Sequence, residues 1–309
     1  MYRIGIDLGG TNIAVGVVDS GYHLISEASV PAGAGRPAEQ VVADMCRAVE
    51  LALDKAGLTA RDCASIGVGA PGTCDPQRGV VVCAYNLGWF NVPVCSMVTA
   101  RLGLPCRLSN DANCAALAET VAGGAVGCRN MILITLGTGV GGGIVADGQL
   151  LEGVGGTGAE VGHTVLVLDG EDCTCGRKGC WEAYASATAL IRQGKRAAAA
   201  QPESLLAGYG EGLTGKDVFD AAAAGDAAAQ AVVDRYCVYV AAGITDLVNI
   251  LGPEKVLIGG GISRQGERLL APIRAYVAAN CFGGHDRTPP VIECARLGNE
   301  AGIIGAAAL

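Results

Sequence analysis

The chain has 309 residues, of which 50% are hydrophobic and 17% are charged, and its formal net charge is -8. This composition supplies ample apolar material for one large domain or two smaller ones and excludes a disordered protein. The acidic balance lacks the basic footprint of a nucleic-acid binder, and no run of Lys and Arg indicates an anionic membrane surface.

The N-terminal residues predict a strand at once, with no basic segment followed by an apolar one, so we expect no signal peptide. The most apolar stretch, residues 131–146, is short for a membrane span and rich in glycine, which favours a strand and a turn. Most of the 14 cysteines are scattered through apolar segments. This distribution is typical of free buried thiols in a reducing compartment, so we expect a cytoplasmic protein.

The first predicted elements form a hairpin. Residues 2–8 predict a strand, residues 9–11 a tight turn, and the β-branched residues 12–19 a second strand. Rossmann and P-loop glycine turns are followed by a helix instead, but the backbone N–H groups of a hairpin can also face a phosphate. Asp7, just before the turn, is a candidate ligand for Mg²⁺ through water. The alternative is an ordinary hairpin capped by Asp7 and Thr11.

A second strand–glycine turn–strand pattern occurs further along the chain. Residues 131–136 predict a strand, residues 137–143 a glycine turn, and another strand begins at residue 144. Two such hairpins predict a duplicated architecture with two related halves. A third glycine segment, Gly259-Gly260-Gly261, follows the strand at 256–258 and is suited to a nucleobase or ribose lying against backbone, although one glycine run is weak evidence by itself.

The remaining predicted elements are helices. Residues 37–56 carry apolar side chains at helical spacing and end before Gly57, which is typical of a residue that closes a helix. Further helices are predicted at 111–122, 217–224, 226–251, 266–280 and 300–309.

Asp111 stands at the start of one of these helices, next to Asn110. A carboxylate there can simply satisfy free backbone N–H groups, and a plain helix cap is the alternative to a function. The helix N-terminus also favours the ionised carboxylate, and a sugar hydroxyl needs only a hydrogen-bonded acceptor as its proton leaves. We therefore interpret Asp111 as a candidate catalytic base, with Asn110 holding a neighbouring hydroxyl.

The strongest local signal is a set of potential metal ligands. Cys173, Cys175 and Cys180 lie within eight residues, separated by glycines and charged residues, and His163 precedes them. One imidazole and three thiols have the composition of a closed structural zinc site. A coincidental cluster in a cysteine-rich chain is the alternative. It is disfavoured because these three cysteines are packed between glycines and charged residues rather than within apolar strands.

Two carboxylates flank this loop. Glu160 lies three residues before His163, and Glu182 lies two residues after Cys180. A metal that binds His163 and Cys180 would fix both carboxylates nearby. Fixed carboxylates suit sugar hydroxyls, which are good donors, and His163 can bond a sugar through its second ring nitrogen.

Together these motifs resemble the ROK family of bacterial sugar kinases and sugar-responsive repressors over almost the entire chain. The zinc loop is the most specific motif, whereas the DxGGT hairpin is shared with the wider actin-like ATPase class. The matching stretches are 7–12, 69–72, 86–89, 110–119, 136–143, 160–163, 173–180 with Glu182, and 259–261.

The resemblance implies an α/β fold of two actin-like (ribonuclease H-like) ATPase domains around a central cleft. The small domain would comprise residues 1–120 and the C-terminal helix 298–309, and the large domain residues 121–297 with the zinc loop. The implied sugar contacts are Gly72, Asn86, Asn110, Asp111, Glu160, His163 and Glu182. The implied ATP contacts are Asp7, Gly9, Gly10, Thr11, Asn12, Gly137, Thr138, Gly139, Gly260 and Gly261.

The resemblance also implies a reaction. Residues 86–93 look most like the glucokinase branch, so we expect ATP- and Mg²⁺-dependent phosphorylation of glucose at its C6 hydroxyl, with Asp111 accepting the proton. N-acetylmannosamine, allose, mannose and fructose remain alternative substrates. Family kinases are commonly dimers or dimers of dimers. One departure is that Asn12 stands where many relatives carry lysine.

There are two non-enzymatic alternatives to a kinase. ROK repressors carry an N-terminal helix-turn-helix domain, and the first strand here begins at residue 2 of an acidic chain, so we do not expect a DNA-binding regulator. A non-catalytic, zinc-stabilised sugar-binding protein is the second alternative. Asp111 and the two glycine hairpins argue against it.

Overall fold

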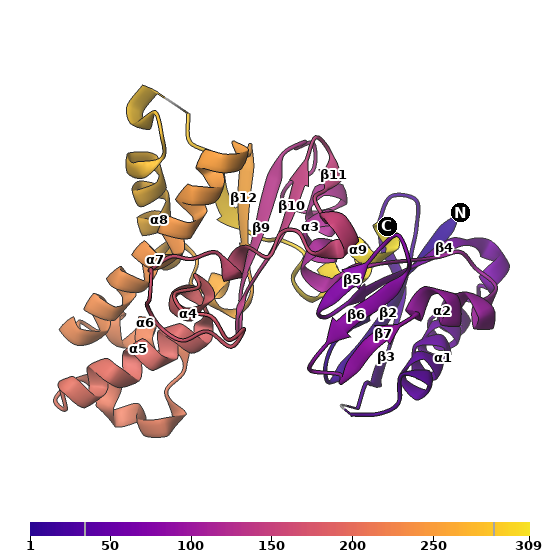
Figure 1. Ribbon diagram of the computed structural model, residues 1–309, viewed down its shortest axis with the longest axis horizontal. Coiled ribbons are helices and arrows are strands. Elements are labelled where there is room, and N and C mark those ends of the chain that lie inside the picture. The colour runs from indigo at the N-terminus through magenta and orange to yellow at the C-terminus, as the bar shows by residue number, and fades with distance from the viewer. Residues whose placement is uncertain (34, 287) are drawn as a thin grey trace. The chain divides into compact units, whose positions relative to one another are not determined.

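The computed structural model describes residues 1–33, 35–286 and 288–309. The chain divides into two compact units (Figure 1): unit 1 comprises residues 1–129, 143–159 and 296–309, and unit 2 comprises 130–142 and 160–295. The expected boundaries assigned all of 121–297 to one domain, whereas the structure places residues 121–129, 143–159 and 296–297 in unit 1. Segment 143–159 packs on helix α3 (Asp111–Val121), where a Cβ on Gly143 would come 2.5 Å from that of Ala116.

Unit 1 is built on a five-stranded sheet with the order β3-β2-β1-β4-β8. Its strand β1 pairs antiparallel with β2 and parallel with β4, as the predicted hairpin requires. The hairpin prediction is confirmed. The strands are β1 (Tyr2–Leu8), β2 (Asn12–Val18), β3 (Leu24–Pro31), β4 (Cys63–Ala70) and β8 (Cys106–Asn110).

The two faces of β1 pack against different helices. Ile4 and Ile6 are fully buried in a core cluster that includes Met45 of helix α1 (Ala38–Ala56). Gly5 points the other way, because successive strand residues alternate between faces. A Cβ on Gly5 would lie 1.9 Å from the carbonyl oxygen of Ile303 in helix α9 (Ala301–Ala308), so this helix packs directly on the strand backbone.

The rest of unit 1 surrounds this sheet. A smaller sheet has the order β5-β6-β7, and the C-terminal helix α9 also contacts α3 and β4. These further elements are β5 (Thr73–Asp75), β6 (Val80–Ala84), β7 (Trp89–Val92), helix α2 (Val94–Leu102) and the 3-10 helix η1 (Ala60–Asp62).

A second five-stranded sheet repeats the first, with the order β11-β10-β9-β12-β13. In both sheets a glycine hairpin is followed by an antiparallel third strand, and two parallel strands complete the other side. The predicted duplication of architecture is confirmed. The strands are β9 (Met131–Leu136), β10 (Val140–Ala146), β11 (Gln149–Leu150), β12 (Lys255–Gly259) and β13 (Val291–Cys294).

Strand β10 begins earlier than the sequence predicted. The glycine run was read as a turn up to residue 143, whereas the strand starts at Val140. Strand pairing uses only backbone groups, and the missing side chain at Gly142 makes room for Val161, whose Cγ2 would lie 2.4 Å from a Cβ there. The turn itself is therefore only three residues long, Gly137–Gly139.

The helices of unit 2 pack around a buried tryptophan. Trp181 is 1% exposed and donates its Nε1–H to the Tyr239 carbonyl at 2.8 Å. A Cβ on Gly243 would lie 2.2 Å from the Trp181 ring, so helix and ring are in close contact. The helices are α4 (Glu182–Ala185), α5 (Ala187–Ala200), α6 (Gly215–Ala223), α7 (Ala227–Leu251) and α8 (Glu267–Asn280).

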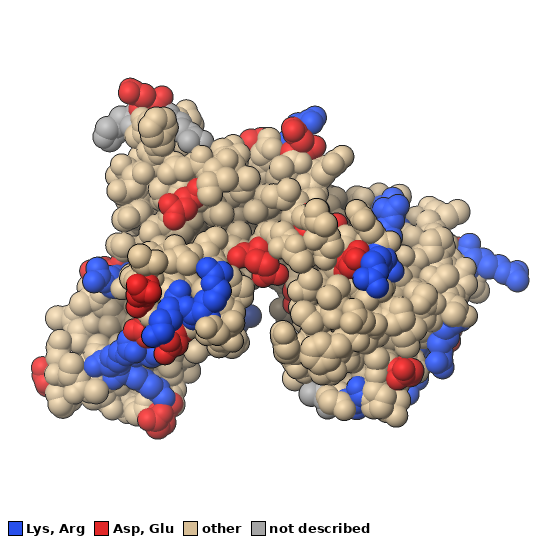
Figure 2. Space-filling view, in the orientation of Figure 1, with Lys and Arg blue, Asp and Glu red and all other residues tan. Residues whose placement is uncertain are grey.

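Charges of both signs are mixed on the surface. Figure 2 shows acidic and basic side chains interleaved over the helices of unit 2. Arg196, for example, makes a two-pronged pair with Glu171 at 2.5 and 3.0 Å. Among the described helices, even the 25-residue α7 is not apolar enough to cross a membrane. All 14 cysteines are free.

Candidate active site

The first glycine hairpin closes through a single backbone bond. The Gly9 N–H donates to the carbonyl of Asn12 at 2.9 Å, and the carbonyl of Thr11 accepts from Ala32 at 3.0 Å. These bonds hold the turn between β1 and β2 in place. Its remaining backbone N–H groups are the candidates for meeting a phosphate.

Two predicted contact residues meet at this turn. A Cβ on Gly10 would lie 3.3 Å from Nδ2 of Asn86, so the phosphate hairpin and the predicted sugar residue are neighbours. The side chain of Asn12 is hydrogen-bonded to the Ser29 hydroxyl, with distances of 2.6 and 2.9 Å. Asn12 is thus held against β3.

Asp7 and Asp111 form an acidic pair within unit 1. Burial, followed by the charge of Asp111, raises the pKa of Asp7 to about 6. Asp111 keeps access to solvent, yet desolvation by the surrounding protein raises its pKa, and backbone hydrogen bonds from Ala112 partly offset this effect. A Cβ on Gly302 would lie 2.3 Å from Asp7 Oδ2, so α9 also borders the pair. Two neighbouring carboxylates with raised pKa values are typical of a cation or proton-transfer site.

The start of α3 is organised by Asn110. Its Oδ1 accepts from the Ala112 N–H at 2.8 Å, and its Nδ2 donates to the carbonyl of Gly72 at 2.9 Å. Asn110 is therefore the capping residue, and Asp111 is the first residue of the helix, with Oδ1 accepting from Ala112 at 2.8 Å. Gly72 has a φ of 83°, and a Cβ there would lie 2.1 Å from the Cys83 carbonyl oxygen. Unit 1 thus brings Gly72, Asn110 and Asp111 together.

The second glycine hairpin lies in unit 2. Gly137 N–H donates to the carbonyl of Gly139 at 3.0 Å, which closes a turn of three residues, as in the first hairpin. The Thr188 hydroxyl donates to the carbonyl of Thr138 at 2.8 Å. Helix α5 therefore supports this turn from its own first residues.

The third glycine segment lies beside that hairpin. β12 pairs parallel with β9, and the pairing ends with Gly259 opposite Thr135. Gly260 follows with a φ of 82°, and a Cβ there would lie 2.4 Å from the Leu136 carbonyl oxygen. Gly261 then begins the 3-10 helix η5 (Gly261–Gln265). Unit 2 thus brings the two predicted nucleotide-binding glycine segments together.

The four predicted metal ligands converge. One donor atom from each of His163, Cys173, Cys175 and Cys180 lies within 4.8 Å of the others. Cys173 Sγ is 3.7 Å from His163 Nδ1, and Cys175 Sγ is 3.7 Å from Cys180 Sγ. Tetrahedral zinc with Zn–S bonds of about 2.3 Å separates its sulfur ligands by about 3.8 Å. Both the donor set and its spacing fit zinc.

Glu182 connects this cluster to the second hairpin. Its Oε2 accepts from the Val140 N–H at 3.0 Å, and its Oε1 accepts from the Thr174 hydroxyl at 3.2 Å. The Cys173 thiol also donates to Oε1 at 3.7 Å. A Cβ on Gly139 would lie 2.1 Å from Oε2, so a side chain at the tip of this turn would displace the Glu182 carboxylate.

Glu160 is the N-cap residue of the 3-10 helix η3 (Val161–His163), and its carbonyl accepts from the His163 N–H at 3.1 Å. The residue before it, Ala159, has a φ of 61°, which is rare for a residue with a side chain. The short helix therefore spaces Glu160 and His163 by a single turn. Its entry is a strained position.

Sequence reasoning missed two side chains of these sites. Thr174 was not singled out, although it donates to Glu182. Glu152 was not singled out either, although its carboxylate accepts a hydrogen bond from Ser109, next to Asn110. Neither contact leaves a sequence signal, because each depends on how the chain folds between the two residues.

Comparisons with known proteins agree with these features. The ROK family profile matches residues 3–309. The chain belongs to the ROK family. Among its relatives, this ROK protein is 39% identical to a glucokinase from Halalkalibacterium halodurans, with 98% of this chain and 93% of the relative covered. It is 41% identical to a glucokinase from Streptomyces coelicolor, with 99% and 96% covered.

Solved ROK structures are similar to this chain over its whole length. A ROK family glucokinase from Streptomyces griseus, in complex with glucose and AMPPNP, has a TM-score of 0.82 and 39% identity, with 100% of this chain and 98% of that chain covered. The predicted family and its actin-like α/β fold class are therefore confirmed. ROK relatives also include a xylose repressor from Caldicellulosiruptor bescii at 30% identity, of which this chain covers 77%.

Proposed function

We propose that this ROK protein is a hexose kinase that transfers the γ-phosphoryl group of ATP to the C6 hydroxyl of glucose. Full-length relatives at about 40% identity are glucokinases, and one similar structure holds glucose and an ATP analogue. The observation that carries the proposal is the acidic pair of Asp7 and Asp111, set beside the first glycine hairpin and the Asn110–Gly72 contact. In this proposal Asp111 is the proton acceptor, and Asp7 and the first glycine hairpin form the neighbouring cation and phosphate site.

Asp111 is the proposed catalytic base. As the C6 oxygen bonds to the γ-phosphorus and the bond to ADP breaks, the hydroxyl proton passes to the Asp111 carboxylate. The raised pKa of Asp111 makes its carboxylate a better proton acceptor than that of an aspartate with an ordinary pKa. Asn110 and Asn86 orient the sugar from unit 1, and Glu160, His163 and Glu182 contribute from unit 2.

Asp7 is the proposed ligand, through water, for the Mg²⁺ that accompanies ATP. When bound, this ion would neutralise charge on the transferred phosphoryl group. Gly9–Asn12 and Gly137–Gly139 are the proposed phosphate contacts, through the backbone N–H groups that do not close the turns themselves, and Gly260 and Gly261 lie against the nucleoside. His163, Cys173, Cys175 and Cys180 are the proposed ligands of a structural Zn²⁺, which would fix the loop that carries Thr174, and the Thr174 hydroxyl donates to Glu182.

The base assignment is tested by Asp111→Asn. We expect turnover to fall at least 10³-fold, on the order of the loss expected when the base cannot accept a proton, with glucose affinity within about threefold of wild type. Turnover is measured by coupled ADP release, and affinity by calorimetry. A variant that turns over at a near-normal rate would remove Asp111 from this role.

The choice of hexose is tested separately. Other relatives include an N-acetylmannosamine kinase from Citrobacter koseri, at 32% identity. A panel of glucose, N-acetylmannosamine, allose, mannose and fructose should give the highest kcat/KM for glucose. If no sugar on the panel supports ADP release although glucose binds, the protein is instead a non-catalytic sugar-binding protein. We further propose a cytoplasmic homodimer or dimer of dimers, which sedimentation of the purified protein checks.

A further inference from the structure

Glu152 lies outside every motif used so far. It follows β11, and its carboxylate accepts a hydrogen bond from the hydroxyl of Ser109. Ser109 is fully buried, with 0% of its surface exposed. A buried hydroxyl without a partner is destabilising, so this carboxylate satisfies a group that water does not reach.

Ser109 occupies a sensitive place in the fold. It is the penultimate residue of β8, followed by Asn110. In the described sheet, β8 is an edge strand that pairs with β4. Asp111 follows directly. Its carboxylate accepts from the Ala112 N–H at 2.8 Å, and because Asp111 directly follows the strand, the direction of its side chain depends on where the end of β8 lies.

Glu152 is itself held firmly. Its carbonyl accepts from the Gly158 N–H at 2.8 Å, which closes the loop between them. Within this loop a Cβ on Gly156 would lie 1.6 Å from the carbonyl oxygen of Cys74, so the loop is pressed against β5. All these residues belong to unit 1. Glu152 therefore presents its carboxylate to β8 from a fixed backbone.

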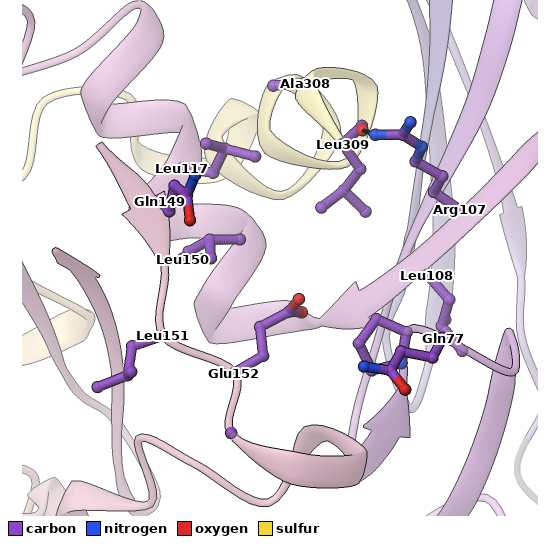
Figure 3. Close-up of a pocket in the computed structure, with 12 residues that line it drawn as sticks. Gln77, Arg107, Leu108, Leu117, Gln149, Leu150, Leu151, Glu152, Ala308 and Leu309 are labelled. Carbon is purple, nitrogen blue, oxygen red and sulfur yellow. Dashed lines mark hydrogen bonds between the residues drawn. The ribbon is translucent and has the colours of Figure 1, made fainter. Parts of the chain in front are cut away.

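The other side of Glu152 is open. Figure 3 shows its side chain at a cavity of about 630 Å³, which is also lined by Gln149, Leu150 and Arg107. Truncating Glu152 extends this existing space and leaves the buried core packing in place. A Glu152→Ala variant is therefore expected to fold, and Gln149, which is exposed on the same wall, supplies a matched control.

We propose that Glu152 is a positioning residue for phosphoryl transfer: by accepting from Ser109, it fixes the end of β8 and so aims Asp111 at the sugar hydroxyl. This inference rests on the proposed kinase function. Asn110 has an independent tie to Gly72 at 2.9 Å, so sugar binding depends less on Glu152 than the chemical step does.

The test compares Glu152→Ala, Glu152→Gln, Ser109→Ala, the Glu152→Ala/Ser109→Ala double variant and the control Gln149→Ala. Because small misplacements of a catalytic group are costly, we expect Glu152→Ala to lower kcat about tenfold with KM for glucose changed less than about threefold. Glu152→Gln keeps a hydrogen-bond acceptor and should stay within about twofold of wild type. The double variant should lose no more than the worse single variant, because both remove one interaction.

Amide hydrogen exchange supplies a readout that needs no turnover. Exchange over residues 110–113 should be faster in Glu152→Ala than in Gln149→Ala. If Glu152→Ala matches the control in both kcat and exchange, or if Glu152→Gln is as impaired as Glu152→Ala, the positioning role is refuted. Wild-type protein inactive on every hexose would refute the proposed function instead, while the exchange comparison would still decide whether Glu152 holds the end of β8.

Discussion

Replacing Asp7 with asparagine should stabilise the ligand-free protein while it abolishes activity with Mg²⁺ and ATP. Burial and the charge of Asp111 raise the pKa of Asp7 from 3.8 to about 6. At pH 8 the carboxylate is ionised in both the folded and the unfolded chain, so the folded state bears the full cost of a charge that its surroundings disfavour. A neutral amide of nearly the same shape removes that cost.

The magnitude follows from the pKa difference. One pKa unit corresponds to about 1.36 kcal/mol, so a difference of about two units sets a ceiling of about 3 kcal/mol. Because Asp7 is only partly shielded from solvent, we expect a gain of about 1–2 kcal/mol in the free energy of unfolding. For a protein of this size that raises Tm by about 2–8 °C.

The sign of the pH dependence is fixed by the direction of the shift. A raised folded-state pKa means that the folded chain binds the proton more tightly, so wild-type stability rises as pH falls from about 7 towards 4. The advantage of Asp7→Asn should therefore be full at pH 8, about half as large at pH 5, and absent below pH 4.

The assay is thermal unfolding in EDTA, without nucleotide, at pH 8 and pH 5. Asp19→Asn is the control of opposite sign, because a backbone hydrogen bond from His23 lowers the pKa of Asp19 and its neutral replacement should not raise Tm. A Tm for Asp7→Asn that is unchanged or lower at pH 8, or a gain that is equal at both pH values, would refute the reasoning. Adding Mg²⁺ and ATP should stabilise wild type more than the variant.

Three further predictions concern the two units. Metal analysis should give about one zinc per chain, and its removal by a chelator should lower Tm and weaken glucose binding; a folded, active, zinc-free protein would contradict the site. Gly5→Ala should cost about 2–4 kcal/mol in urea unfolding, because its Cβ would lie 1.9 Å from a backbone oxygen, whereas Gly208→Ala, in open space, should be nearly neutral. Ala159→Gly should gain about 0.5 kcal/mol by relieving a φ of 61°, and a loss of stability would show that the position is not strained.

The local elements of this chain could be predicted because their causes are local. The strand–turn–strand hairpin at 2–18 appears in the structure as predicted, since β-branched residues and a glycine turn lie next to each other in the sequence. The four predicted metal ligands come together for the same reason: three of them lie within eight residues, and short loops cost little entropy to close. The start of strand β10 was predicted wrongly because glycines occur both in turns and where a neighbouring side chain packs closely on a strand. Here Val161 packs against Gly142, and the sequence does not show this contact.

The sequence by itself determined which chemical groups this ROK protein has available: two glycine hairpins, a carboxylate at the start of a helix and a Cys₃His set. It left Asp111 as either a plain helix cap or a base. The tertiary structure distinguishes these two readings. Asn110 is the capping residue, and Asp111 lies close enough to Asp7, more than 100 residues away in the chain, to raise the pKa of Asp7. A pKa depends on burial and on neighbouring charges, and these are properties of the folded chain alone.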